Sequence, residues 1–364
     1  MARIELKALR HSYQPDPKGD QDYALKQVDL VWEDGGAYAL LGPSGCGKTT
    51  LLNIISGLLR PSEGSVLFDG VEVNELSPEE RQIAQVFQFP VVYDTMSVYD
   101  NLAFPLRNRG LPESEIDSRV RAIAEMTDLS DMLQRKASGL TADGKQKISL
   151  GRGLVREDVN VIMFDEPLTV IDPHLKWKLR SKLKELHQRV RVTMIYVTHD
   201  QTEALTFADK VVVMHDGWVV QEGTPVELFE RPRHTFVGHF IGSPGMNLLP
   251  CEWADGRARV AGHLVQTAQA MIQPRADAKL ELGIRPEFIR FVDAGTAGGL
   301  PVDIVNIRDT GRNRIVETDL AGHVVRILVN EGLPIPEGRA HVLFDPAYTQ
   351  LYADSWIVEA GDQQ

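Results

Sequence analysis

The clearest chemical motif of the sequence is a glycine-rich stretch at residues 42–49, which reads Gly42-Pro43-Ser44-Gly45-Cys46-Gly47-Lys48-Thr49. It satisfies the pattern G-x-x-x-x-G-K-[ST], whose glycines let backbone N–H groups turn inward around phosphate oxygens. Lys48 adds a positive charge at the β- and γ-phosphates, and Thr49 offers a hydroxyl to Mg²⁺. An apolar run, Ala37–Leu41, precedes the motif, and a helix-like segment beginning at Thr50 follows it. This order predicts nucleotide binding by residues 42–50, assisted by the partial positive charge of the helix N-terminus.

Two carboxylates and a histidine stand at the ends of later apolar runs. Asp165 and Glu166 follow the run at residues 161–164, and His199 closes the run that begins at residue 194. Asp165 can hold Mg²⁺, mostly through water, and Glu166 can orient or deprotonate a hydrolytic water. Alone, such a pair is more often a solvated strand end, and a lone histidine is usually structural. Beside a phosphate-binding loop they become candidate catalytic residues, with the neutral imidazole of His199 able to bond the γ-phosphate or the attacking water.

The elements around these motifs change in character along the chain. The first 230 residues alternate short apolar runs with longer periodic stretches, which predicts an α/β fold with buried parallel strands. Capping-box sequences at residues 77–80 and 224–227 predict helix starts, and Asp216-Gly217 predicts a hairpin. Residues 231–247 are rich in proline and glycine and predict a linker. Beyond them, short alternating segments predict a β-barrel or sandwich, and they lie at 258–260, 282–284, 289–291, 302–307, 314–316, 324–329 and 341–344.

Composition excludes several classes of protein. The 364 residues are 43% hydrophobic and 25% charged, as in a globular protein with a real core. Acidic residues outnumber basic ones, 51 to 39, and the net charge of −12 disfavours nucleic acid as the main partner. Two cysteines far apart in the sequence favour a reducing compartment. Because no apolar stretch approaches the roughly 20 residues of a membrane-spanning helix, a role at a membrane requires docking onto a protein that spans it.

Several motifs in order resemble the ATPases of the ATP-binding-cassette (ABC) family over roughly residues 3–240. They are the phosphate-binding loop, Val86-Phe87-Gln88, a segment before Phe164-Asp165-Glu166-Pro167, Asp172 and Val197-Thr198-His199-Asp200. Two further stretches are similar to the ATPase subunits of bacterial carbohydrate and glycerol-phosphate importers, of the maltose-importer type, namely Val98-Tyr99-Asp100-Asn101-Leu102-Ala103-Phe104 and Gly283-Ile284-Arg285-Pro286-Glu287. The resemblance implies an α/β P-loop ATPase domain at 1–240, with a helical subdomain at about 88–155. An all-β, OB-like (TOBE-type) domain is implied at 241–364.

The resemblance also assigns roles to single residues. Tyr13 sits where the family stacks an aromatic ring on adenine, although an aromatic residue that packs at a strand end would also occur there. Gln88 matches a glutamine that senses Mg²⁺ and the γ-phosphate, and residues 89–96 would receive the coupling helix of the permease. Asp172 resembles the aspartate that contacts the phosphate-binding loop of the opposite subunit. Nearby Val170 is apolar where such importers usually carry a polar residue, so communication there is expected to differ.

The sequence departs from the family in the signature segment. The usual Leu-Ser-Gly-Gly-Gln is replaced by Leu140-Thr141-Ala142-Asp143-Gly144. In the family this loop caps the γ-phosphate held by the opposite subunit, and Thr141 keeps the hydroxyl for that contact. Asp143 would place a carboxylate near the triphosphate, and one like-charge pair at about 4 Å costs roughly 4 kcal/mol at an effective dielectric near 20. Alternatively, the loop turns so that Asp143 points outward, Gly144 takes the glycine role, and Lys145 and Lys147 compensate part of the charge.

The expected function is that of the ATP-hydrolysing subunit of an ABC importer, with ATP and Mg²⁺ as cofactors. The implied partners are permease subunits, a second ATPase subunit and an extracytoplasmic solute-binding protein, and the expected location is the cytoplasmic face of the inner membrane. The solute is a sugar, a polyol or glycerol phosphate. The degenerate signature favours a non-identical second subunit over a homodimer. It also leaves open an ATP-binding regulatory or scaffolding protein of low turnover. Cys46 is interpreted mainly as a small residue that fits the loop, but a thiol near a helix N-terminus can have a lowered pKa, and alkylation of Cys46 that ATP blocks is therefore predicted.

Overall fold

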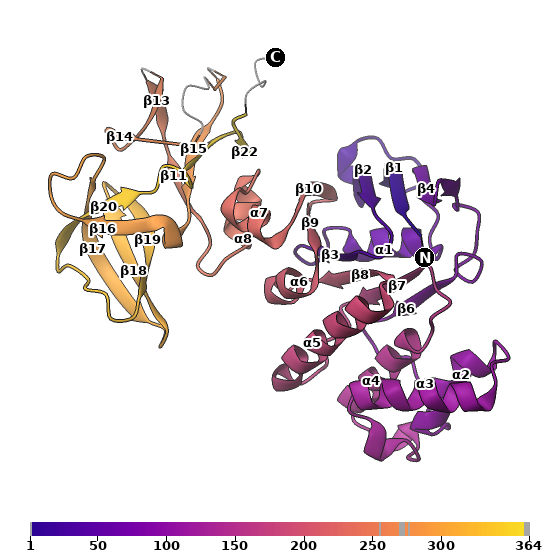
Figure 1. Cartoon of the computed structure of the whole chain (residues 1–364). Coiled ribbons are helices and arrows are strands. Elements are labelled where there is room, and N and C mark those ends of the chain that lie inside the picture. Colours follow the sequence, from indigo (N-terminus) through magenta and orange to yellow (C-terminus); the bar gives the residue numbers. More distant parts are fainter. Residues whose placement is uncertain (1, 255, 269–273, 276, 360–364) are drawn as a thin grey trace. The chain divides into compact units, whose positions relative to one another are not determined.

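A computed structural model describes residues 2–254, 256–268, 274–275 and 277–359, and Figure 1 shows its helices and strands. The chain forms two compact units, residues 1–225 and 226–364. Helices α7 (Pro225–Glu230) and α8 (Thr235–Phe240) belong mostly to the second unit, whereas the sequence analysis placed them in the first.

The first unit is built on a six-stranded sheet with the strand order β10-β9-β3-β8-β7-β6. Five neighbouring strands, β9, β3, β8, β7 and β6, pair in parallel, as the apolar runs predict. The sixth strand, β10, pairs antiparallel with β9 and forms the predicted hairpin. The strands are β3 (Ala37–Leu41), β6 (Ile83–Val86), β7 (Val161–Asp165), β8 (Thr193–Thr198), β9 (Lys210–His215) and β10 (Trp218–Gly223). In a parallel sheet the strands end at one edge, so this arrangement brings the polar residues after β3, β7 and β8 together.

Helices cover both faces of this sheet. On one face, α1 (Lys48–Ser56) shares a core with the six-stranded sheet and with an antiparallel sheet of order β2-β1-β4-β5. The strands of that second sheet are β1 (Ile4–His11), β2 (Leu25–Trp32), β4 (Glu63–Phe68) and β5 (Val71–Glu72). On the other face, α5 (Pro173–Val190) and α6 (Gln201–Phe207) pack together, and Phe207 contacts the ring of Tyr196 in β8 (Figure 1).

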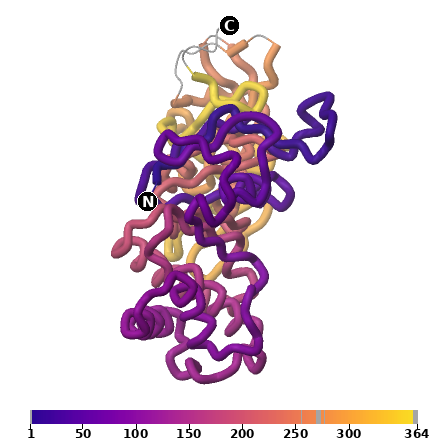
Figure 2. Tube along the Cα trace, turned by 90° about the vertical axis from the view of Figure 1, so that its right-hand side faces the viewer, coloured from indigo at the N-terminus to yellow at the C-terminus, as the bar shows by residue number. Residues whose placement is uncertain are grey.

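Residues 98–154 fold as a helical lobe of the first unit. Helices α2 (Val98–Arg107), α3 (Glu113–Met126) and α4 (Ala142–Leu154) pack on one another, and two short 3-10 turns, Ser130–Met132 and Ala137–Gly139, join α3 to α4. Figure 2 shows this purple segment as a separate group of coils at the bottom of the view. The lobe lies within the predicted helical subdomain at about 88–155.

The predicted helix after Ser77 is wrong. Ser77 and Glu80 do make capping-box hydrogen bonds, since Glu80 Oε2 accepts from the Ser77 amide at 2.8 Å. The chain forms only a turn because Gln82 adopts a φ of +51° and β6 begins at Ile83. A capping box therefore closed one turn here without a helix to follow it.

The second unit is mostly β structure, as predicted. Three antiparallel sheets have the orders β11-β15-β21-β22, β12-β13-β14 and β16-β20-β17-β18-β19, and all three contribute to one hydrophobic core. Every predicted strand segment falls on one of these strands, which are β11 (Asn247–Pro250), β12 (Glu252–Ala254), β13 (Arg257–Val260), β14 (His263–Val265), β15 (Leu280–Ile284), β16 (Ile289–Val292), β17 (Leu300–Asp309), β18 (Asn313–Leu320), β19 (His323–Asn330), β20 (Arg339–Phe344), β21 (Gln350–Ala353) and β22 (Trp356–Ile357).

One buried arginine ties α7 and α8 to this β structure. Arg285 follows β15, is 2% exposed, and donates to the carbonyls of Leu228 and Phe229 in α7. It also donates to Gly238 in α8 and to Ile241, the residue that ends α8. These carbonyls lie in the last turns of two short helices. Carbonyl groups at that end of a helix have no hydrogen-bond partner within the helix. The arginine therefore closes the C-terminal ends of both helices.

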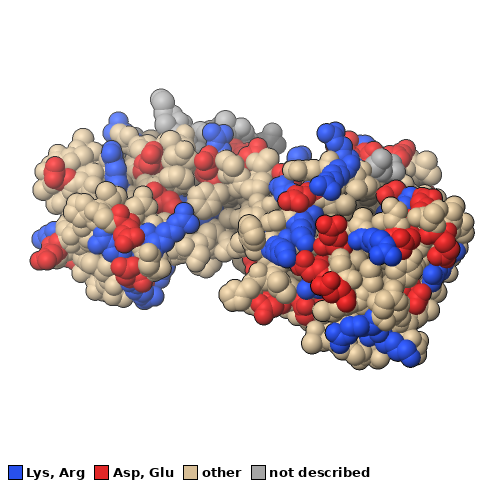
Figure 3. Space-filling view, turned by 60° about the horizontal axis from the view of Figure 1, so that its bottom comes forward, with Lys and Arg blue, Asp and Glu red and all other residues tan. Residues whose placement is uncertain are grey.

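Charges on the surface are mixed in sign. Blue and red side chains are interspersed over much of the face drawn in Figure 3. Across the described stretches of the chain, no helix is both long enough and apolar enough to span a bilayer.

Candidate active site

The glycine-rich loop lies between β3 and α1, as predicted, and two of its glycines are required by close approaches of the backbone. Gly47 is the N-cap of α1 with a φ of +100°, and a Cβ there would lie 2.7 Å from the Ala24 carbonyl oxygen. A Cβ on Gly42 would lie 2.3 Å from the carbonyl oxygen of Met214, in β9. The loop therefore presents its backbone to ligands because side chains have no room at these positions.

A pocket of about 390 Å³ opens in front of this loop. Ser44, Lys48, Thr49 and Thr50 line one side. Tyr13, Ala24, Gln88 and Glu166 come from four other segments and line the rest of the wall. Lys48 is only 5% exposed, and its Nζ donates to the carbonyl oxygens of Gly42 and Pro43 at 2.8 and 2.9 Å. Backbone amides, a buried ammonium and hydroxyls in one pocket form a binding site for phosphate oxygens.

Asp165 and Thr49 form an oxygen-rich pair beside the pocket. Thr49 Oγ1 donates to Asp165 Oδ1 at 3.3 Å, and burial at the end of β7 raises the pKa of Asp165. A hydroxyl and a carboxylate are the hard oxygen donors that Mg²⁺ takes together with substrate phosphates. The described residues contain no cluster of three or more His, Cys, Asp or Glu able to hold a metal. The pair therefore fits a cation shared with bound phosphates.

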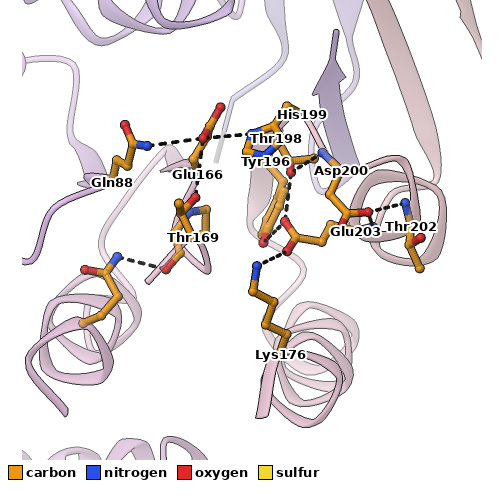
Figure 4. Close-up of polar contacts among 12 residues, drawn as sticks. Gln88, Glu166, Thr169, Lys176, Tyr196, Thr198, His199, Asp200, Thr202 and Glu203 are labelled. Carbon is orange, nitrogen blue, oxygen red and sulfur yellow. Dashed lines mark hydrogen bonds and ion pairs between the residues drawn. The ribbon is translucent and has the colours of Figure 1, made fainter. Parts of the chain in front are cut away.

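Glu166 is the meeting point of the predicted catalytic residues (Figure 4). His199 Nδ1 lies 3.0 Å from Glu166 Oε2, and Gln88 Nε2 donates to the same oxygen at 3.4 Å. The Thr169 hydroxyl also donates to it at 3.4 Å, a contact the sequence analysis missed. The Glu166 side chain is 16% exposed, and its backbone amide donates to the Val197 carbonyl at 2.9 Å. The carboxylate is thus oriented from three sides while it borders the pocket.

Tyr13 lies at the pocket wall and is 66% exposed. Its hydroxyl lies 3.1 Å from Thr50 Oγ1, and its ring meets the ring of His11 edge-on, with centroids 4.7 Å apart. The ring is therefore held at both ends and offers a face to a planar ligand.

Cys46 corrects one expectation. Burial raises the pKa of this thiol, and the nearby ammonium of Lys48, 3.9 Å away, offsets the effect only in part. The side chain is 3% exposed. Proximity to a helix N-terminus predicted a lowered pKa, but desolvation of the thiolate outweighs it.

The signature-like loop leads directly into helix α4. Thr141 is the N-cap of α4 and accepts from the Gly144 amide at 3.3 Å. Asp143 stands in the first turn, and its Oδ2 lies 3.3 Å from Lys147 Nζ. Lys145 pairs instead with Asp94 at 2.7 Å. Of the two lysines, only Lys147 therefore compensates the negative charge of Asp143, through an i,i+4 ion pair on one face of the helix.

The two residues predicted to act toward the opposite subunit do not line this pocket. Thr141 does not line it, and neither does Asp172, which is the N-cap of α5 and accepts from the His174 amide at 2.9 Å. Both were assigned roles toward the opposite subunit, so their predicted contacts are not made within one chain.

Gln146 is a second residue the sequence analysis did not single out as functional. Its side chain is buried, and Nε2 donates to the carbonyl oxygens of Phe87 at 3.0 Å and Pro167 at 2.9 Å. It thereby joins the backbone beside Gln88 to the backbone beside Glu166. The available signal was an uncharged amide between two lysines near the start of a helix, which is too weak to predict this contact.

Comparisons with known proteins identify the family of the chain. The family model described as ABC transporter matches residues 25–169, and the MalK OB fold domain matches residues 242–289. The chain is 42% identical over 306 residues to the sn-glycerol-3-phosphate import ATP-binding protein UgpC of Rhodopseudomonas palustris, which covers 84% of this chain and 80% of that protein. It is 37% identical over 358 residues to UgpC of Yersinia enterocolitica, with 97% of each chain covered.

Solved structures match about three fifths of the chain. One is cbiO1 of Clostridium perfringens, part of the ABC transporter complex cbiONQ, with a TM-score of 0.56, 29% identity, and coverage of 63% of this chain and 90% of that one. Another is the ATP-binding cassette MJ0796, a dimer in a post-hydrolysis state bound to ADP and Pi, with a TM-score of 0.55, 28% identity, and coverage of 61% and 98%. The chain belongs to the ABC transporter family, as the ATP-hydrolysing subunit of an importer whose C-terminal domain is of the MalK OB-fold type.

Proposed function

We propose that this subunit hydrolyses Mg-ATP to energise the uptake of sn-glycerol 3-phosphate through a membrane permease. The observation that carries the hydrolytic part is the contact of Glu166 with His199 and Gln88 at the wall of the phosphate pocket. The names of relatives that span nearly the whole chain support the solute. In this scheme the chain works as a peripheral protein at the cytoplasmic face of the inner membrane, and an extracytoplasmic protein delivers the solute.

The chain's own residues divide the work of hydrolysis. The loop amides and Lys48 bind the β- and γ-phosphates, and Tyr13 takes the adenine ring. Thr49 and Asp165 would hold Mg²⁺, which supplies charge neutralisation at the phosphates when bound. Glu166 orients the attacking water and accepts its proton, and His199 and Gln88 fix the carboxylate in the required direction.

We further propose that the second ATPase subunit is a different chain. Asp143 places a negative charge in the first turn of α4, the helix end that caps a γ-phosphate in the family. A helix N-terminus favours anions through its partial positive charge, and a carboxylate there opposes a second anion. The Lys147 pair at 3.3 Å weakens this repulsion and supports the alternative of a homodimer. A partner with a standard signature would complete the site built by Lys48, Asp165 and Glu166.

The test uses Glu166→Gln, which should bind ATP and hydrolyse it slowly. The mass of the purified chain is measured by light scattering after gel filtration, with and without Mg-ATP, beside Lys48→Ala as the control. Binding of ATP without a change in mass is expected if the partner is non-identical, and a doubling of mass would instead establish a homodimer.

The transport assignment is tested separately. The tagged chain should co-purify with permease subunits, and vesicles holding the complex should take up labelled sn-glycerol 3-phosphate when ATP is inside. Uptake of a sugar or polyol but not of the phosphate ester would overturn the solute, and the absence of any permease would overturn the importer role.

A further inference from the structure

A buried carboxylate outside the nucleotide pocket sits behind His199. The side chain of Glu203, in the first turn of α6, is 5% exposed. Its Oε2 accepts from the Thr198 hydroxyl at 2.8 Å and from the Tyr196 hydroxyl at 3.2 Å, and Lys176 Nζ lies 3.6 Å from its Oε1 (Figure 4). A buried charge persists only when it is paired and hydrogen-bonded, and this one is.

The hydrogen bonds of this cluster hold both neighbours of His199. The Thr198 hydroxyl, which donates to Glu203, also accepts from the Asp200 amide at 3.0 Å. Asp200 in turn is the N-cap of α6, and its Oδ1 accepts from the Thr202 and Glu203 amides at 2.7 and 3.3 Å. The ring of His199 is 53% exposed and therefore has little packing of its own. Its position against Glu166 depends on these backbone anchors.

The same cluster reaches a second helix through one ion pair. Lys176 lies in the first turns of α5, and its amide donates to the carbonyl of Asp172, the N-cap of that helix, at 3.1 Å. Its ammonium crosses to Glu203 in α6. A shift of the start of α5 would therefore displace the residues that hold His199, through an ion pair between the partly exposed ammonium of Lys176 and the buried carboxylate of Glu203.

We propose that Glu203 is a positioning residue for His199, and that Lys176 couples this positioning to the start of helix α5. This inference rests on the proposed hydrolytic function. A displacement of Asp172 moves Lys176, and Lys176 moves the loop that carries His199 against Glu166. The rate of hydrolysis therefore depends on contacts made with the N-terminus of α5.

The test compares Lys176→Met with Lys178→Met in the full chain assembled with its partners. Lys178 is a matched control because it lies on the same helix but pairs with Asp128. Lys176→Met is expected to lower kcat on the order of tenfold, as small misplacements of catalytic groups do, while KM for ATP stays the same. Lys176→Arg should restore kcat, and Lys178→Met should leave both constants unchanged.

Two further measurements separate positioning from loss of structure. In a His199→Ala background, Lys176→Met should add no further loss of kcat, because both changes act on one group. In the isolated full chain, diethylpyrocarbonate should modify His199 faster in Lys176→Met than in wild type, as judged by mass spectrometry of the peptide. If Lys176→Met lowers the melting temperature too far, Thr198→Val tests the same anchor without burying an unpaired charge.

The outcomes distinguish the two proposals. Wild-type rates of hydrolysis and of His199 modification in Lys176→Met, or an equal loss of kcat in the His199→Ala background, would overturn the positioning role. A wild-type complex that binds but does not hydrolyse ATP would overturn the proposed function, while the modification experiment would still decide the coupling of Lys176 to His199.

Discussion

Replacing Arg285 with methionine should destabilise the C-terminal unit strongly without changing the nucleotide pocket. The guanidinium is buried and donates to four carbonyl oxygens, those of Leu228, Phe229, Gly238 and Ile241. Methionine keeps much of the apolar stem but removes the guanidinium donor from all four oxygens, and of these the Gly238 oxygen still accepts from the Met246 amide at 3.0 Å. Burial lowers the pKa of Arg285 to about 10, so the side chain is still charged at neutral pH and its bonds are charge-assisted.

The expected loss is about 3–5 kcal/mol in the free energy of unfolding of residues 226–364. This is the usual effect of removing one partner from a buried charged network, because the remaining polar groups lose a buried, charged donor. The contact of the guanidinium with the Phe229 ring, 4.2 Å from its centroid, is lost as well.

Pulse proteolysis of the full chain in urea measures this change, and mapping of the fragments tells which unit has unfolded. Arg290→Met is the matched control, because Arg290 lies on β16 of the same unit and is exposed. Its effect should stay within about 0.5 kcal/mol. A loss below about 1 kcal/mol for Arg285→Met would refute the argument, since it would mean that water satisfies the four carbonyls equally well.

Three further predictions concern the pocket and its surroundings. Iodoacetamide should label Cys46 and Cys251 slowly in the folded chain, and the rate should still rise with pH at about pH 9, because burial raises both thiol pKa values, that of Cys251 to about 12. Tyr13→Ala should weaken ATP binding about tenfold by loss of the ring, whereas Tyr13→Phe should bind nearly as well, as judged by fluorescence titration. Gln146→Leu should lower kcat and cost about 1–3 kcal/mol of stability in a urea melt, because the buried Pro167 carbonyl and the partly buried Phe87 carbonyl lose their donor.

The glycine-rich loop was predictable because its geometry is local. The pattern of residues that binds phosphate lies within the motif, and its context needs only one strand before it and one helix after it. The approaches of Ala24 and Met214 to its glycines come from elsewhere in the fold and were not predictable. The alternating segments of the C-terminal unit were predictable for a similar reason, since a strand with one buried face shows its period directly.

The contacts between catalytic groups were predictable in type but not in geometry. Glu166 meets His199 because β7 and β8 are neighbours in the sheet, a pairing that no local pattern specifies. The ion pair of Lys176 with Glu203 joins two helices, so it could not be predicted from local sequence either. The direction of the pKa shift of Cys46 was not predictable for a different reason, because the depth of burial that sets this pKa is a property of the whole fold.

The backbone conformation of Glu166 distinguishes a protein that hydrolyses ATP from one that only binds it. This residue has a φ of +46°, in the left-handed region, where a side chain with a Cβ costs about 1–2 kcal/mol relative to the right-handed region. Glycine would relieve that strain, so a chain that only held ATP would be more stable without a glutamate here. The chain instead keeps a glutamate with a strained backbone beside its own phosphate pocket. The strain lowers the stability of the fold, and the carboxylate it positions serves ATP hydrolysis.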